Sequence, residues 1–493
     1  MSSFLKKMAM FFLCLIVVFC QSCTSNQPKI QTTAEQASPA KQPDVQPAEQ
    51  SKIVAKIGDY LITSEDLEKR IIEKLSPGPI TSSEQALPIK PIEVLKEMIA
   101  EKAMIIEARN LHLIDDKQMQ DRLRDFKDTL LVKLLITNYL ADNINVTDSE
   151  IEEKIKANPS LDKASAKKKL ESEKADKLLP EFYNDLCKKL HLRKLTENFP
   201  KAAQIHQRLL KEAVNFGKFI TLNQINKLPQ EEKNLPLAAY DGGEIKFSDL
   251  LAVLHEIAPP DRSADLSTPA GIEKFLTERN VMKRPIFIAG AKLYGLEKNE
   301  SFLKNVKLQE EKILSDQIIG RQLEGIKDSN SKDVQNYFKT HRKYFESPNS
   351  ISIDQIWCQD HKTALIVKAG LDAGKNFDSL KQEYSLDKRS GPAEVSVYSE
   401  KMFFPKMWDS EPNAFVGPIK GVYKNRINWR IVKITKKTWA ARHGYEDEME
   451  PEVKNRMWSE RSNAILAAFR KQLLQKYSYQ IYPENIKNPL DIP

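Results

Sequence analysis

The apolar positions between residues 91 and 142 repeat with a helical period. Pro91 opens a segment in which every third or fourth residue from Ile92 to Ile106 is apolar, which is the pattern of a helix that begins with proline and packs on a core. A second long helix is predicted at about 116–142. The stretch TDSE at 147–150 has the spacing of a capping box and predicts the start of a further helix.

A different period marks the stretch ISIDQIWC at 351–358, where apolar and polar residues alternate. Alternation predicts a β-strand that places Ile351, Ile353, Gln355 and Trp357 on one face. Gln355 is the polar exception on that face. Two interpretations are open: a core amide whose hydrogen bonds are satisfied, or a residue left from an active site.

The hydrophobic pattern also reveals an internal duplication. AKIGDYLITSEDL (55–67) aligns with AAYDGGEIKFSDL (238–250) at an offset of 183 residues, which pairs Asp66 with Asp249. The helical segments that follow match at the same offset. Apolar matches between helices arise easily by chance, but polar matches at a constant offset do not.

The offset changes towards the end of the chain. FYNDLCKKLHLRKLTEN (182–198) aligns with FRKQLLQKYSYQIYPEN (469–485) at an offset of 287 residues. The second copy is therefore longer than the first by 104 residues, which fall between about Phe345 and Glu446. That length predicts a small domain inserted between the helical part of the second copy and its returning helix.

The first 51 residues predict export and a tether. Lys6 and Lys7 precede an apolar run from Met8 to Phe19, which has the length of a signal-peptide core. Ser22–Cys23 resembles the junction at which bacterial lipoprotein signals are cut and the cysteine is lipidated. The segment 24–51 contains four prolines, no glycine and no aromatic residue, so it cannot bury enough apolar surface to fold. As a coil it would reach roughly 30 Å.

Composition excludes several classes of function. The chain has 76 basic and 68 acidic residues, a formal net charge of +8, and this mixed surface lacks the clustering of a nucleic-acid footprint. No His/Cys cluster with metal spacing, phosphate loop or Ser-His-Asp set is recognisable, so no cofactor is expected. Beyond Cys23, the mature chain keeps Cys187 and Cys358, which could form one disulfide or remain buried thiols.

The residues quoted above resemble the chaperone module of the SurA/PrsA-type periplasmic foldases. The resemblance is carried by IVAKIGDYLITSEDLEKRI (53–71), the helical pair, VTDSEIEEKIKANP (146–159) and the returning helix. In that family a parvulin-type peptidyl-prolyl isomerase domain is commonly inserted before the C-terminal helix. The insert resembles such a domain in KTALIVKAGLDAGKNFDSLKQEYSLD (362–387), NAFVGPIKG (413–421) and NWRIVKI (428–434).

The resemblance implies an α+β fold: mainly helical tandem SurA-like modules plus a small parvulin-like domain with an antiparallel sheet. The predicted segments, in chain order, are a lipoprotein-type signal (1–23), a disordered tether (24–51), the first helical module (52–200), a helical linker (201–236), the second helical module (237–346), the parvulin-like domain (347–437), and a C-terminal helix and strand that return to the second module (438–493).

The resemblance also assigns site positions, and they depart from the family pattern. The family's two central histidines fall on Gln355 and Arg430, and its Cys/Asp position falls on Asp387. Its threonine position falls on Gly421, or is displaced by a small insertion. Arg430 carries a charge that cannot change protonation state, and an Asp387–Arg430 pair is expected.

The family's apolar proline pocket maps onto Val395, Phe403 and Met407, with Trp408 alongside. These four residues either bind proline or an apolar peptide, or form the ordinary core of a small domain. Both interpretations remain open. Efficient isomerisation is expected less than either peptide binding or a purely structural core.

Three hypotheses follow for function. The first is an exported chaperone, tethered through Cys23 to a membrane (the outer membrane is favoured), that binds unfolded extracytoplasmic clients without ATP and whose isomerase activity is weak or lost. The second is an active parvulin-type isomerase of secreted proteins. The third is a lipoprotein scaffold with one dedicated partner. None requires nucleic acid or a small-molecule cofactor.

Overall fold

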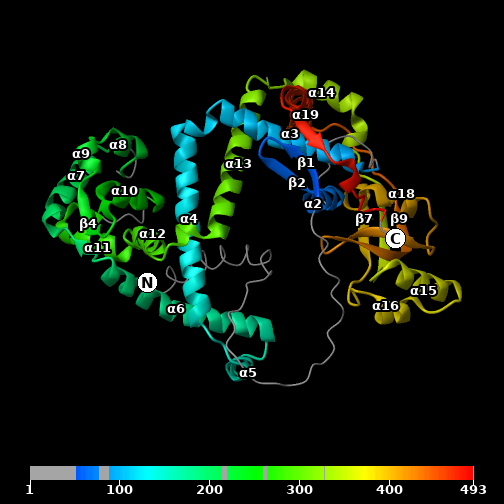
Figure 1. Cartoon of the computed structure of the whole chain (residues 1–493), viewed down its shortest axis with the longest axis horizontal. Helices are drawn as coiled ribbons and strands as arrows, with labels where there is room; N and C mark the ends of the chain where they lie inside the picture. Colours follow the sequence, from blue (N-terminus) through cyan, green and yellow to red (C-terminus); the bar gives the residue numbers. More distant parts are fainter. Residues whose placement is uncertain (1–51, 77–87, 214–218, 259–263, 327, 492–493) are drawn as a thin grey trace. The chain divides into compact units, whose positions relative to one another are not determined.

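The computed structural model describes residues 52–76, 88–213, 219–258, 264–326 and 328–491 (Figure 1). Within these ranges it is mainly helical with small antiparallel sheets, which confirms the predicted α+β class. The predicted signal, Cys23 and the tether lie outside the described residues. No helix in the described ranges has both the length and the apolar character needed to cross a bilayer.

The first copy of the repeat begins with a β-hairpin that is followed by helices. Its elements are β1 (Ile53–Ile57), β2 (Tyr60–Thr63), α2 (Ser64–Leu75), α3 (Pro91–Asn110), the short 3₁₀ helix η1 (Leu113–Asp115), α4 (Lys117–Asn143), α5 (Asp148–Ala157), α6 (Lys163–Lys189), β3 (Arg193–Lys194) and η2 (Thr196–Asn198). The long helix predicted at about 116–142 is α4. The predicted capping box caps α5, because Thr147 Oγ1 accepts from Glu150 N while Glu150 accepts from Thr147 N.

The second copy repeats this order of elements. Its elements are β4 (Pro236–Tyr240), β5 (Gly243–Lys246), α10 (Phe247–Glu256), α11 (Pro269–Glu278), α12 (Lys283–Leu293), η5 (Leu296–Lys298), α13 (Glu300–Leu323), α14 (Ser331–Thr340), α19 (Glu450–Lys476), β10 (Tyr479–Ile481) and η9 (Pro483–Asn485). Elements β4, β5, α10, η5, α13 and α14 each begin 183 residues after β1, β2, α2, η1, α4 and α5. Helix α19 ends 287 residues after α6, so the element boundaries confirm the duplication.

The matched aspartates have the same structural role in both copies. Asp66 Oδ2 accepts a hydrogen bond from Thr63 N at 3.0 Å, and Asp249 Oδ2 accepts one from Lys246 N at 2.7 Å. Each carboxylate thus satisfies a backbone donor at the start of the helix that follows the hairpin. The polar match in the sequence reflects helix capping.

The two copies exchange their returning strands. Strand β3 of the first copy pairs with β4, and β10 at the end of the second copy pairs with β1. The prediction that the C-terminal strand returns to the second module is therefore wrong. The long helices account for the exchange: α4 has 27 residues, which is roughly 40 Å, so the chain ends each copy far from the hairpin with which it began.

The hydrophobic cores likewise combine elements from both copies of the repeat. Helices α2 and α3 bury their apolar faces together with Leu314 and Ile318 of α13 and with Phe469 and Leu473 of α19. The predicted linker is also part of a core, because α7 (Phe199–Lys211) packs with β4, α10 and α11. Two short helices, α8 (Leu222–Lys227) and α9 (Gln230–Lys233), complete this segment.

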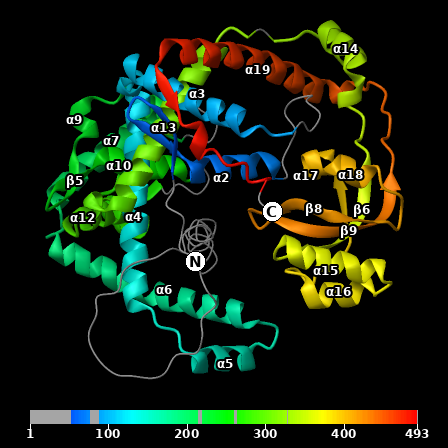
Figure 2. The ribbon, with the colours of Figure 1, turned by 45° about the vertical axis from the view of Figure 1, so that its right-hand side comes forward.

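The inserted domain is a four-stranded antiparallel sheet with helices on both faces (Figure 2). The strand order is β7 (Ala393–Ser396), β6 (Ser350–Cys358), β9 (Arg426–Thr438), β8 (Phe415–Tyr423). Helices α15 (His361–Asp372) and α16 (Phe377–Tyr384) cover one face. The other face is covered by a segment made of α17 (Val397–Glu400), η7 (Lys401–Phe403) and α18 (Phe404–Trp408). Strand β6 contains the alternating stretch, with Ile351 and Ile353 buried on the α18 side and Ile356 and Cys358 on the α15 side.

Candidate functional site

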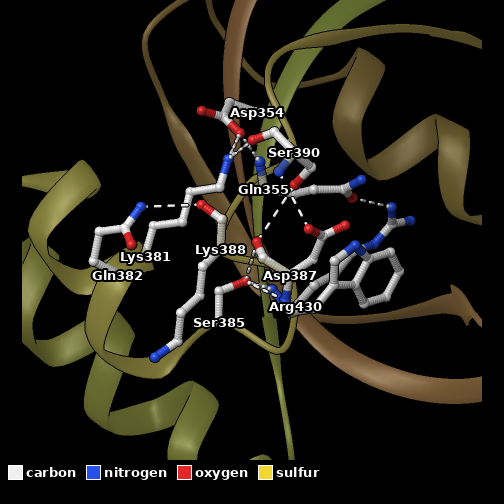
Figure 3. A network of polar contacts seen from close by, with 10 residues as sticks. Asp354, Gln355, Lys381, Gln382, Ser385, Asp387, Lys388, Ser390 and Arg430 are labelled. Carbon is white, nitrogen blue, oxygen red and sulfur yellow. Dashed lines mark hydrogen bonds and ion pairs between the residues drawn. The ribbon is translucent and has the colours of Figure 1, made fainter. Parts of the chain in front are cut away.

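Gln355 lies at the centre of the inserted sheet and is bonded to Arg430. The β6–β9 register places Gln355 opposite Val432 and Trp357 opposite Arg430, so all four side chains emerge on one face. Arg430 Nη1 donates to Gln355 Oε1 at 2.8 Å. The two positions that the family resemblance assigned to histidine are therefore in direct contact, as a neutral amide and a cation (Figure 3).

The charge of Arg430 is neutralised by Glu400, a residue that the sequence analysis did not single out. Both terminal nitrogens of the guanidinium donate to the Glu400 carboxylate, Nη1 at 3.2 Å to Oε1 and Nη2 to Oε2. The Arg430 residue is 1% exposed. Because a buried arginine is costly without a partner, such a residue in an apolar strand is itself a signal that a carboxylate must approach. Glu400 supplies it from the end of α17.

Gly421 makes room for the arginine. A Cβ at this position would lie 2.6 Å from Arg430 Nε and 2.7 Å from the tip of the Trp357 ring. The guanidinium carbon lies 4.8 Å from the centroid of that ring, which is a cation–π contact. The glycine at this position leaves the space that the Arg430–Trp357 stack occupies.

Asp387 is engaged by its own loop. Its Oδ1 accepts from Ser390 N at 3.2 Å. Ser385 Oγ accepts from Asp387 N at 3.1 Å and from Trp357 N at 3.2 Å, and it donates to Asp387 O at 2.9 Å. The expected Asp387–Arg430 pair is not formed, because Glu400 reaches the guanidinium from the opposite segment and Asp387 closes a turn.

A buried lysine also holds the loop that contains Asp387. Lys381 Nζ donates to Asp354 Oδ1 and to the carbonyl oxygen of Ser390, each at 2.5 Å (Figure 3). Lys381 is 4% exposed, and it forms an ion pair with the Asp354 carboxylate. The loop is therefore held by polar contacts from both Ser385 and Lys381.

The predicted apolar pocket residues divide between core and surface. Met407 is fully buried and Val395 is 8% exposed, and both pack with Ile351 and Ile353 in the core of the α18 face. Phe403 is partly buried and packs against the apolar cluster around α2 and α3.

Trp408, the fourth predicted pocket residue, is partly buried and contacts two other aromatic rings. It stacks on Phe404 at 5.9 Å between ring centroids and meets Trp439 edge-on at 4.7 Å. The four predicted residues thus belong to different environments: the core of the α18 face, the cluster around α2 and α3, and the Trp408–Trp439 contact.

The polar side chains at the centre of the inserted sheet bind one another. Arg430 Nη1 and Nη2 donate to Gln355 Oε1 and to the Glu400 carboxylate, whereas Arg430 Nε has no partner among the described residues. The described residues contain no cluster of three or more His, Cys, Asp or Glu side chains that could hold a metal ion. The thiols of Cys187 and Cys358 are both free.

Comparisons with known proteins give distant matches. No protein-family model matches the chain. The foldase protein PrsA of Caldanaerobacter subterraneus subsp. tengcongensis is 22% identical over 200 residues, which cover 39% of this chain and 62% of that protein. The matched region is thus less than two thirds of that relative's length.

Two solved structures illustrate the structural matches. One is from a study of PEB4 and Cj1289, two SurA-like chaperones of Campylobacter jejuni; it is 16% identical, covers 47% of this chain and 95% of its own, and has a TM-score of 0.22. The other is foldase PrsA of Streptococcus pneumoniae, at 15% identity, with coverage of 49% and 83% and a TM-score of 0.24. Scores this low carry no argument by themselves.

Proposed function

We infer that this SurA/PrsA-like chain is an exported chaperone that binds unfolded extracytoplasmic polypeptides, and that its inserted domain no longer isomerises prolyl bonds efficiently. The observation behind the second part is the Gln355–Arg430–Glu400 network. Rotation about a prolyl bond has a barrier of about 18–20 kcal/mol, and a catalyst must bind the twisted amide better than the planar one. Here the polar groups at the assigned positions bind one another.

The first part is supported by apolar surface on the long helices. A groove of about 460 Å³ runs between α4 and α13, and its apolar lining includes Leu123, Leu131, Phe302, Leu303 and Val306. An exposed apolar groove is a common mark of a binding surface. Several weak contacts of this kind hold an extended client reversibly and need no nucleotide.

Aggregation of an unfolded outer-membrane-type client tests this proposal. The chain without its signal segment is expected to suppress light scattering, and Leu303→Gln is expected to weaken the effect. Leu308→Gln is the matched control, because both leucines are 54% exposed but only Leu303 lines the groove. If the parent chain fails at stoichiometric excess, the chaperone proposal is wrong. One stoichiometric partner in pull-downs would instead favour a dedicated scaffold.

A protease-coupled assay with proline peptides tests the isomerase part. We expect a rate close to the uncatalysed one for the parent chain and for Gln355→Ala and Asp387→Ala alike. Clear catalysis that either substitution abolishes would establish the alternative, an active parvulin-type enzyme acting on secreted proteins.

We further propose that Cys23 is lipidated and that the chain is periplasmic, attached to a membrane, with the outer membrane favoured. The support is the signal-like apolar run and the Ser22–Cys23 junction. Radiolabelled palmitate incorporation that is lost in Cys23→Ser, together with release of that variant into the soluble fraction, is the expected result. Unchanged membrane association of Cys23→Ser would contradict lipid anchoring.

A further inference from the structure

The inserted domain has a surface groove at the end of its sheet, where β7, the start of β6 and the end of β9 lie side by side. The groove has a volume of about 680 Å³ and is lined by β7, by Tyr398 and Ser399 of α17, and by the chain segments that enter β6 and leave β9. The side chains used below are Glu394, Val395, Tyr398 and Trp439. None of them belongs to the Gln355–Arg430–Glu400 network.

Strand β7 forms one wall of this groove. It is the end strand of the sheet and pairs on one side with β6, from Ser350 opposite Ser396 to Ile353 opposite Ala393. Glu394, Val395 and Ser396, three of its four residues, line the groove. The backbone N–H and C=O of Ser396 already bond Ser399 Oγ. The outer side of an edge strand can pair with an added extended segment, so a peptide in the β conformation would pair at Glu394.

Two exposed aromatic rings lie in the same groove. Trp439 is 72% exposed and Tyr398 is 37% exposed. The Trp439 ring is held edge-on by Trp408 at 4.7 Å between centroids, so it is supported by the domain although it faces solvent. A supported, exposed tryptophan is the kind of residue that contributes most to binding when a partner covers it.

The charge of the groove defines the partner further. Glu394 is the one charged side chain among the described residues that line it, and this residue is exposed. Ser350 Oγ donates to Glu394 Oε1, while Oε2 accepts no hydrogen bond within the described part of the chain. A carboxylate beside two ring faces attracts a lysine or arginine side chain.

We propose that the β7 groove binds an extended segment of unfolded polypeptide in which a lysine or arginine lies close to an apolar side chain. The segment pairs its backbone with β7, places the apolar group on Trp439 and directs the cation towards Glu394 and Tyr398. This inference rests on the proposed chaperone function and specifies one class of client segment. It does not use the positions that resemble an isomerase site.

Fluorescence anisotropy with labelled ten-residue peptides tests the proposal on the chain without its signal segment. The probe alternates lysine with valine and phenylalanine, and a second peptide has glutamate in place of each lysine. We expect the basic peptide to bind more tightly, and Trp439→Ala to weaken it by about tenfold or more. Glu394→Gln should reduce the preference for the basic peptide and its dependence on salt, because the attraction is electrostatic.

Trp458→Ala is the matched control, since Trp458 is also an exposed tryptophan, at 50%, but lies on α19 outside the groove. N-methylation of alternate backbone amides of the probe should abolish strand pairing and weaken binding. Equal binding by the parent chain and Trp439→Ala, or equal binding of the basic and acidic peptides, would overturn the inference.

The aggregation assay separates this inference from the proposed function. Suppression of aggregation together with peptide binding that ignores Trp439→Ala would refute the groove and leave the chaperone function in place. Failure in both assays would refute the function itself. If the chain forms dimers that Trp439→Ala dissociates, a second copy occupies the groove and the proposal is wrong.

Discussion

Two polar regions of the inserted sheet differ in what their side chains bind. At the centre, Arg430 is enclosed and its partners Gln355 and Glu400 are its immediate neighbours. At the β7 edge, Glu394 and Trp439 face solvent and keep surface that no described residue covers. Arg430 and Glu400 neutralise each other, and removing one partner of such a buried pair is strongly destabilising. Groups held in place but uncovered can act on another molecule, so the edge is the better candidate for binding.

The largest effect should come from removing the central cation's partner. Glu400→Ala leaves Arg430 buried without its carboxylate, and we expect a loss of about 3–5 kcal/mol in the stability of the inserted domain. The double variant Arg430→Met/Glu400→Leu removes both charges and should be less destabilised than Glu400→Ala. If Glu400→Ala unfolds at the same denaturant concentration as the parent chain, the centre is not structural.

Cys358 gives a readout that is specific to this domain. Its thiol is fully buried on the α15 face, and burial raises the pKa of Cys358 to about 12, with a further contribution from the nearby Asp360 carboxylate. Because the thiolate is the reactive form, Cys358 should resist thiol reagents in the folded parent chain. Faster labelling of Cys358 in Glu400→Ala, measured by mass spectrometry, would report opening of this domain.

A smaller loss is expected from Gly421→Ala. The added Cβ would lie within 3 Å of the Arg430 guanidinium and the Trp357 ring, and crowding of this kind costs about 1–3 kcal/mol. Gly391→Ala is the control, because nothing lies within 4 Å of its added Cβ. Urea unfolding followed by Cys358 labelling checks both. Equal midpoints for the two variants would mean that the centre tolerates a side chain at 421.

The central site could be predicted only in part. Family resemblance placed Gln355 and Arg430 at related positions, and the structure brings them together. Glu400 was not predictable in the same way, because it lies 30 residues before Arg430 on a four-residue helix that has no periodic pattern. Asp387 was expected to pair with Arg430, but its carboxylate accepts from Ser390 N within a local turn.

The constant offset between the aligned segments was more informative about the fold than the similarity of any one pair of segments. They gave the duplication and the length of the insertion, because each element keeps its own hydrophobic period in both copies. They could not give the exchange of β3 and β10 between the two hairpins. Both hairpins have the same pattern, so a returning strand is equally compatible with either one, and only the length of the intervening helices decides.

A loss of about 1 kcal/mol is expected from Ser385→Ala. The hydroxyl accepts from the backbone N–H groups of Trp357 and Asp387 and fixes the loop beside the network, and one such hydrogen bond contributes about 0.5–1.5 kcal/mol. Ser379→Ala is a control on an exposed helix position in the same domain. Chemical denaturation checks the pair. A loss as large as that of Glu400→Ala would mean that the loop, and not the ion pair, holds the centre.

The smallest effect on stability is predicted for the edge. Trp439→Ala should change the unfolding free energy of the domain by only about 0.5 kcal/mol, because a largely exposed side chain gives up little burial when it is removed. The peptide affinity of the same variant should fall far more than its stability. A residue that contributes to binding but hardly to folding distinguishes the β7 edge from the Arg430 centre. The measurement is urea unfolding and peptide anisotropy on one preparation of protein. A loss of several kcal/mol on Trp439→Ala would assign Trp439 to the Trp408–Phe404 core, and the distinction between an open edge and a closed centre would then no longer hold.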